Sequence, residues 1–123
     1  MAIPSTVNPT ASGKEVLRRT FIDGQNETLT TILTVPTDHI CTILSINFCE
    51  VSSEADAKAH IVVKPDGGAD FHIMTNQPIG VNGTFVYSEK LVLTGGDLLQ
   101  VKFGGSGTIT GDVWVSYIDQ DWS

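Results

Sequence analysis

The fold class is decided by residues 83–119, which read GTFVYSE (83–89), KLVLTGGDLLQVKF (90–103) and, after a glycine-rich break, TITGDVWVSYID (108–119). The runs are rich in Val, Ile, Thr, Phe, Tyr and Trp, and glycines separate them. Short runs of this kind, about four to eight residues long and bounded by glycine turns, are typical of antiparallel strands. The stretch therefore predicts an all-β sandwich or barrel and not a helical fold.

The chain before this stretch carries the same pattern of strands and turns. Asp23-Gly24 and Pro65-Asp66-Gly67-Gly68 are turn signals: the first leads by a short loop from one strand to the next, and the second closes a hairpin. Turn signals about 8 to 12 residues apart are typical of sandwiches and jelly rolls. We expect one antiparallel, jelly-roll-like β-sandwich over residues 16–123, with its earlier strands at 16–23, 28–35, 40–51, 57–64 and 71–75.

The first residues differ in composition from the rest of the chain. Residues 1–13 hold two prolines and no charged side chain, which favours an extended segment over a packed element. We therefore expect an extended N-terminal arm over residues 1–15. Such an arm is either a frayed terminus or a segment that lies on a neighbouring subunit. In the second case the arm residues expected to make the contact are Ile3, Pro4 and Val7.

Alternation along the strands predicts which side chains face the core. In the run ICTILSINF (40–48) the apolar even positions share one face, and we expect that face to point inward. In the last strand Val113 and Val115 point one way and Trp114 the other, so Trp114 is expected on the outside. The predicted core consists of Leu44, Ile46, Phe48, Ile61, Val63, Leu99, Val101, Phe103, Val113 and Val115.

Charge is distributed unevenly along the chain and argues against some partners. The formal net charge is −7, yet residues 1–19 contain three basic and one acidic residue, whereas residues 20–123 carry 13 acidic and 4 basic residues. An acidic body of this kind repels phosphate backbones, so we expect no nucleic-acid partner. The sequence has no run of 18 apolar residues and no signal-peptide pattern, so we expect no membrane partner and synthesis in a cytoplasm.

Residue types that can do chemistry are few, and their spacing predicts no catalytic, cofactor or metal site. His39, His60 and His72 lack the usual metal-ligand spacings, so we expect packed or surface histidines. Cys41 and Cys49 lie in one predicted strand about 26 Å apart, which is too far for a disulfide. We therefore expect no enzyme activity and no cofactor. A small enzyme remains an alternative hypothesis, after the two that are described below.

Several motifs resemble those of small virion structural proteins of tailed bacteriophages. They are ICTILSINFCEVSS (40–53), KLVLTGGDLLQVKF (90–103) and VWVSYID (113–119). Asp97 follows the Gly-Gly turn as in that class, whereas Glu50 stands where the class often has Asn. The resemblance implies a capsid decoration (cement) protein that binds the major capsid protein on the outer surface of the virion, with a neck, tail or fibre component as the alternative.

Decoration proteins of this kind commonly form trimers, so the resemblance also implies a homo-oligomer, with a trimer favoured. Outside the arm, the residues expected to make these contacts are Arg18, Arg19, Trp114 and Trp122. A second hypothesis is a carbohydrate-binding or receptor-binding β-sandwich module. Its sugar platforms would be Tyr87, Trp114, Tyr117 and Trp122.

Overall fold

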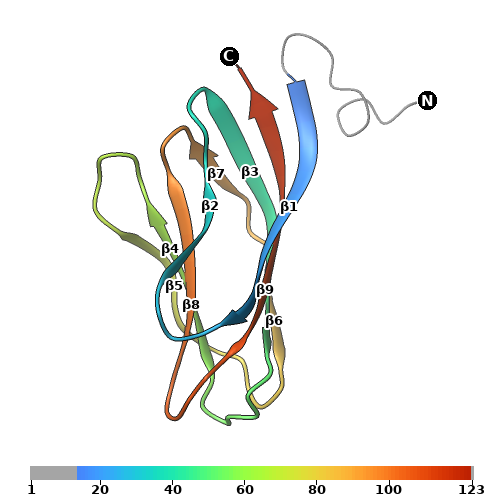
Figure 1. Ribbon diagram of the computed structural model, residues 1–123, viewed down its shortest axis with the longest axis vertical. Coiled ribbons are helices and arrows are strands. Elements are labelled where there is room, and N and C mark those ends of the chain that lie inside the picture. Colours follow the sequence, from blue (N-terminus) through green and yellow to red (C-terminus); the bar gives the residue numbers. More distant parts are fainter. Residues whose placement is uncertain (1–13, 123) are drawn as a thin grey trace, which may run out of the picture.

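The computed structural model describes residues 14–122, which form nine strands and no helix (Figure 1). Runs of β-branched and aromatic residues account for most of the strands. Among the described residues no helix is long and apolar enough to cross a membrane. The strands are β1 (Lys14–Gln25), β2 (Thr30–Thr34), β3 (His39–Glu50), β4 (Lys58–Lys64), β5 (Phe71–Pro78), β6 (Thr84–Tyr87), β7 (Leu91–Thr94), β8 (Leu98–Gly104) and β9 (Gly111–Asp121).

Two antiparallel sheets pack face to face, as Figure 1 shows. In the first, here called sheet A, the order is β1-β9-β3, and β6 and β7 pair with successive parts of the far edge of β3. In the second, sheet B, the order is β2-β8-β4-β5. The predicted antiparallel β-sandwich is confirmed. Among the described strands, β1 forms one edge of sheet A, and β6 and β7 form the other.

The first two strands lie in opposite sheets. β1 begins at Lys14, inside the range expected for the arm, and it does not end at Asp23-Gly24 but continues to Gln25. The pairing with β9 shifts register between Ile22 and Gln25, and Gly24 has a φ of +77°, so the dipeptide forms a β-bulge within the strand. The chain then crosses to sheet B, where β2 pairs with β8.

The core between the sheets contains nine of the ten predicted residues, all of them buried. The prediction for Leu44 was wrong: its side chain is only half-buried and lines a hollow on the outer face of sheet A. The cause is a β-bulge in β3, where the pairing with β9 shifts between Ile43 and Ser45. Before the bulge the odd positions Cys41 and Ile43 are buried, and after it the even positions are.

Asp97 holds two turns together at one end of the sandwich. Its carboxylate accepts hydrogen bonds from the backbone N–H of Thr94 and of Asp66, both at 2.9 Å. The first bond caps the turn between β7 and β8, and the second reaches across to the turn between β4 and β5. Gly96 in this turn has a φ of +91°, a conformation that favours glycine.

Candidate functional site

The outer face of sheet A exposes apolar side chains along a row that crosses four strands. Phe21 of β1 lies opposite Trp114 of β9, which lies opposite Asn47 of β3, which in turn lies opposite Val86 of β6. Phe21 is 53% exposed, Trp114 41% and Val86 49%. Trp114 therefore faces outward as predicted.

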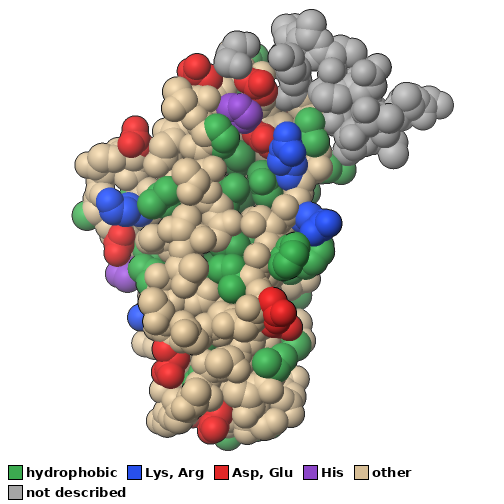
Figure 2. Space-filling view, viewed as in Figure 1, with side chains coloured by type: hydrophobic (Ala, Val, Ile, Leu, Met, Phe, Trp, Pro, Cys, Tyr) green, Lys and Arg blue, Asp and Glu red, His purple; other side chains and the backbone are tan. Residues whose placement is uncertain are grey.

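Phe21, Trp114 and Arg19 form a cluster that we call the aromatic ridge. The rings of Phe21 and Trp114 stack with centroids 5.2 Å apart and planes 12° from parallel. The Arg19 guanidinium lies 5.6 Å from the centroid of the Phe21 ring and 5.1 Å from that of Trp114. From top to bottom along the right-hand side of Figure 2, where β1 lies, basic side chains are followed by hydrophobic side chains and then by acidic ones.

Two open hollows flank the aromatic ridge. The upper hollow, of about 690 Å³, is lined on one side by Leu17 and Arg19 of β1 and on the other by Leu44 at the β3 bulge. The lower hollow, of about 390 Å³, is lined by Trp114 and by the acidic side chains Asp23 and Asp112. The bulge that removes Leu44 from the core thus shapes the outer surface.

Asp23 and Asp112 place two carboxyl groups next to each other at the rim of the lower hollow. The hydrogen bond to Asp112, and then the repulsion between the two like charges, raises the pKa of Asp23. Asp112 also accepts a hydrogen bond from the backbone N–H of Gly24 at 3.1 Å. The face therefore has a cation at Arg19 and a concentrated negative charge below it.

Arg18 points to the other side of β1 and joins three strands. Its Nε donates to Asp119 Oδ2 at 2.9 Å, and His39 Nδ1 lies 2.7 Å from the other carboxylate oxygen. Asp119 is also near the thiol of Cys41; burial, and then this carboxylate, raises the pKa of Cys41 to about 12. Nucleophilic chemistry needs a thiolate, so this thiol is poorly suited to it.

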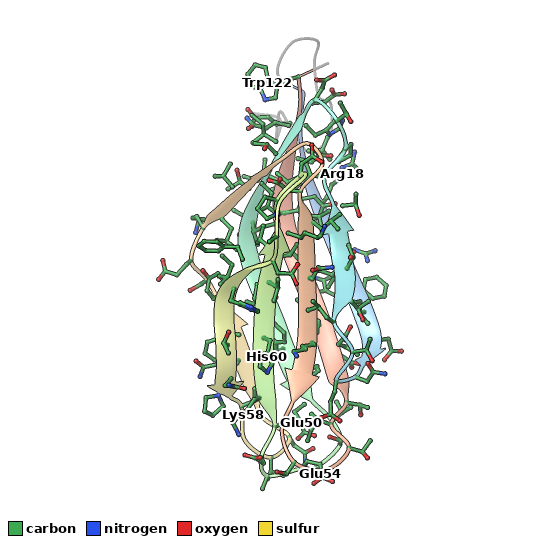
Figure 3. All side chains as sticks on the ribbon, turned by 90° about the vertical axis from the view of Figure 1, so that its left-hand side faces the viewer. Arg18, Glu50, Glu54, Lys58, His60 and Trp122 are labelled. Atoms are coloured by element: carbon green, nitrogen blue, oxygen red, sulfur yellow. The ribbon has the colours of Figure 1, made fainter. Side chains whose placement is uncertain are left out.

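Glu50 is a buried carboxylate that the sequence did not single out as functional. It accepts hydrogen bonds from the backbone N–H of Asn82 at 2.7 Å and of Ser52 at 2.5 Å, and from the Ser52 hydroxyl. Burial by itself would raise the pKa of Glu50, but these hydrogen bonds outweigh it and lower the pKa. Glu50 lies at the lower end of the sandwich (Figure 3), where it ties two loops to β3.

The remaining histidines are placed separately. His60 is buried in β4, and burial, followed by the charges of Lys102 and His72, lowers its pKa. His72 pairs across the β4–β5 hairpin with Val62 and not with His60. Within residues 14–122, no group of three or more His, Cys, Asp or Glu side chains is placed to hold a metal ion. Cys41 and Cys49 are both free thiols, as expected.

The aromatic residues expected to bind sugar do not form one platform. Tyr117 is 8% exposed and belongs to the core, and Tyr87 packs against that core from β6. Trp122 is exposed, and its backbone N–H donates to the carbonyl of Asp38 at 2.9 Å. It lies one residue beyond the end of β9, eight residues after Trp114, and eight residues of extended chain span about 26 Å. The remaining predicted contact residues, Ile3, Pro4 and Val7, lie outside the described residues.

Comparison with solved structures gives a viral counterpart for this fold. A chain from the acidic stable capsid structure of Helicobacter pylori bacteriophage KHP30 is similar with a TM-score of 0.50 and 9% sequence identity, over 85% of this chain and 86% of that one. A weaker similarity, with a TM-score of 0.48 and 9% identity, relates 89% of this chain to 37% of a chain from the crystal structure of the infectious bursal disease virus VP2 subviral particle. No protein-family model matches the sequence, and no curated protein is significantly similar to it.

The similarity to the KHP30 chain is one of overall fold. The matched shares of the two chains are nearly equal, so the two chains have nearly the same length. The β-sandwich described above is therefore also the fold of a small chain in a bacteriophage capsid structure.

Proposed function

We propose that this protein is a structural component of a virus particle, and that it decorates the outside of the head and bridges coat subunits. The observation that carries the proposal is the fold shared with a chain of a bacteriophage capsid structure over nearly the whole of both chains. The strand and turn motifs of the sequence support the same class of protein.

The surface of sheet A supports an interaction role. Leu17, Phe21 and Val92 are each more than half exposed on its outer side, and the Phe21 ring stacks against that of Trp114. Contiguous exposed apolar side chains on a small domain are commonly covered by a partner. The acidic body, with 13 acidic and 4 basic groups after residue 19, fits a position on the outside of a shell, away from packaged nucleic acid.

We propose that the N-terminal region is the part of this protein that binds the coat protein. Residues 1–19 carry a net charge of +2 and precede or belong to the edge strand β1. Ordering a segment on a partner costs about 1–2 kcal/mol of backbone entropy per residue. Main-chain hydrogen bonds to a sheet edge of the coat protein would offset that cost most directly. In this arrangement Arg18, held by Asp119, fixes the root of the arm to the domain.

The test is to mix purified protein with undecorated heads and to measure bound copies per head and the temperature at which heads rupture. We expect the full chain to bind and raise the rupture temperature, and a chain lacking residues 1–13 to bind at least tenfold more weakly while keeping the same β-sheet circular dichroism. Lys64→Ala, an exposed change in sheet B, is the matched control and should bind normally.

Two results would contradict parts of the proposal. Equal binding by the full and shortened chains would remove the arm from the mechanism. No binding by the full chain would favour a neck, tail or fibre location, which the same assay with purified tails would detect.

A further inference from the structure

We infer that the free edge of β1 is a contact between two copies of this chain, which pair antiparallel about a twofold axis at Phe21. β1 pairs only with β9 among the described strands, so the opposite edge of this 12-residue strand has no strand partner. Unpaired edges present rows of backbone donors and acceptors that a second strand can use. This contact is separate from attachment to a head and can be tested on the purified protein.

The charged side chains of β1 indicate which partner fits this strand edge and in which register it pairs. Arg19 and Asp23 both lie on the outer face of β1, two residues before and two residues after Phe21. When two β1 strands pair antiparallel with Phe21 opposite Phe21, each Arg19 stands directly opposite the partner's Asp23. Directly opposed residues in such a pair have Cβ atoms about 4.5–5.5 Å apart, within reach of an ion pair. A second copy therefore supplies the complementary charge on both sides of the axis.

Among the described residues, neither Arg19 nor Asp23 forms a salt bridge. The Arg19 guanidinium lies over the Phe21 and Trp114 rings. Asp23 instead lies next to a second carboxyl group, that of Asp112. A guanidinium from a second copy would relieve this like-charge contact.

The shape of the surface fits the same packing. The stacked Phe21 and Trp114 rings are exposed, and the lower hollow of about 390 Å³ beside them is lined by Asp23 and Asp112. A twofold axis at Phe21 brings the two ridges together and places each Arg19 near the partner's lower hollow. Contacts of this type are isologous, since one patch meets itself. The bulge, with its positive φ at Gly24, would end the ladder on each side just after the pair of Arg19 with the partner's Asp23.

The first experiment is cross-linking in full-length protein carrying Cys49→Ser, which removes the half-buried native thiol and leaves buried Cys41. Phe21→Cys places two thiols opposite each other at the axis, and we expect a disulfide-linked dimer under mild oxidation. Leu17→Cys is the matched control. In the proposed register the residue at position 17 of one chain lies about 26 Å from the residue at position 17 of the other, so no disulfide should form.

The second experiment is sedimentation velocity at micromolar concentration with a charge exchange. Arg19→Asp and Asp23→Arg should each weaken dimerisation at least tenfold, and the double variant should restore it. Lys64→Asp makes the same charge change as Arg19→Asp on an exposed position in sheet B, and it should have no effect. Circular dichroism checks that each variant is folded.

The outcomes separate the proposal from its competitors. A monomer at all concentrations, or a trimer without cross-linking at residue 21, overturns it. If Arg19 instead protects the edge from pairing, Arg19→Gln will increase association, which also overturns it. If cross-linking at residue 21 occurs only after residues 1–13 are deleted, those residues and not a second copy occupy the edge.

Discussion

Replacing Glu50 by Gln should destabilise the protein at neutral pH, because Glu50 holds two loops with one carboxylate. The Glu50 carboxylate accepts two short, charge-assisted hydrogen bonds, from the backbone N–H of Ser52 at 2.5 Å and of Asn82 at 2.7 Å. A third hydrogen bond, from the backbone N–H of Glu54, is longer, at 3.4 Å. Bonds to a charged group contribute about 1.5–3 kcal/mol each. The amide of Gln keeps one acceptor oxygen and turns an NH₂ group towards the other donors.

The expected cost is about 1–3 kcal/mol, the value for roughly one such bond, because the amide oxygen of Gln still accepts a hydrogen bond from one of the donors. The cost should depend on pH. The pKa of Glu50 is lowered from 4.5 in the folded protein, so its stabilisation is fully present above that value and is lost as pH falls through the folded pKa. The difference between Glu50→Gln and the unchanged protein should therefore shrink as the pH falls below 4.5.

The assay is urea denaturation followed by tryptophan fluorescence at pH 7 and at pH 3. Glu27→Gln, in an exposed loop, is the control and should change the free energy of unfolding by less than about 0.5 kcal/mol. The reasoning fails if Glu50→Gln is as stable as this control at pH 7. It also fails if the destabilisation is equally large at both pH values.

Three further changes test other parts of the fold. Leu99→Ala should cost about 2–5 kcal/mol in urea denaturation because the side chain is fully buried, whereas Val92→Ala, at an exposed position, should cost less than about 0.5 kcal/mol. Gly96→Ala should lower the midpoint of thermal unfolding, since φ is +91° and the added Cβ would lie 2.5 Å from a side chain of the β4–β5 turn; an unchanged midpoint would contradict this. Thiol labelling at pH 8 should modify half-buried Cys49 quickly and buried Cys41, with a pKa of about 12, only after unfolding; rapid labelling of both thiols would contradict the burial of Cys41.

The sequence pattern predicted the strands and most of the core because burial in a sandwich follows a period of two. It failed at Leu44, where one extra residue reverses the alternation in the middle of β3. No local signal such as glycine or proline marks that position. The ladder with β9, far along the chain, determines where the extra residue is accommodated.

The contact surface was predictable only in part, for the same reason. Alternation placed Trp114 outside, but its stacking partner Phe21 comes from a strand more than 90 residues earlier, and only the β1–β9 register brings them together. The role of Glu50 also depends on a distant segment, the loop that contains Asn82. Which distant strands pair depends on the topology of the fold, and the local sequence pattern carries no information about that topology.

The central place of β9 in sheet A has a consequence for synthesis on the ribosome. β9 lies between β1 and β3, so the first strand to be made must wait for the last before it gains its only described strand partner. Domains dominated by such distant pairings fold in milliseconds to seconds, more slowly than helical ones. During that interval the apolar side chains of β1 are open to other nascent chains. A chain that stops before residue 111 would keep an unfinished sheet and should accumulate as aggregates, whereas release of the complete chain permits closure.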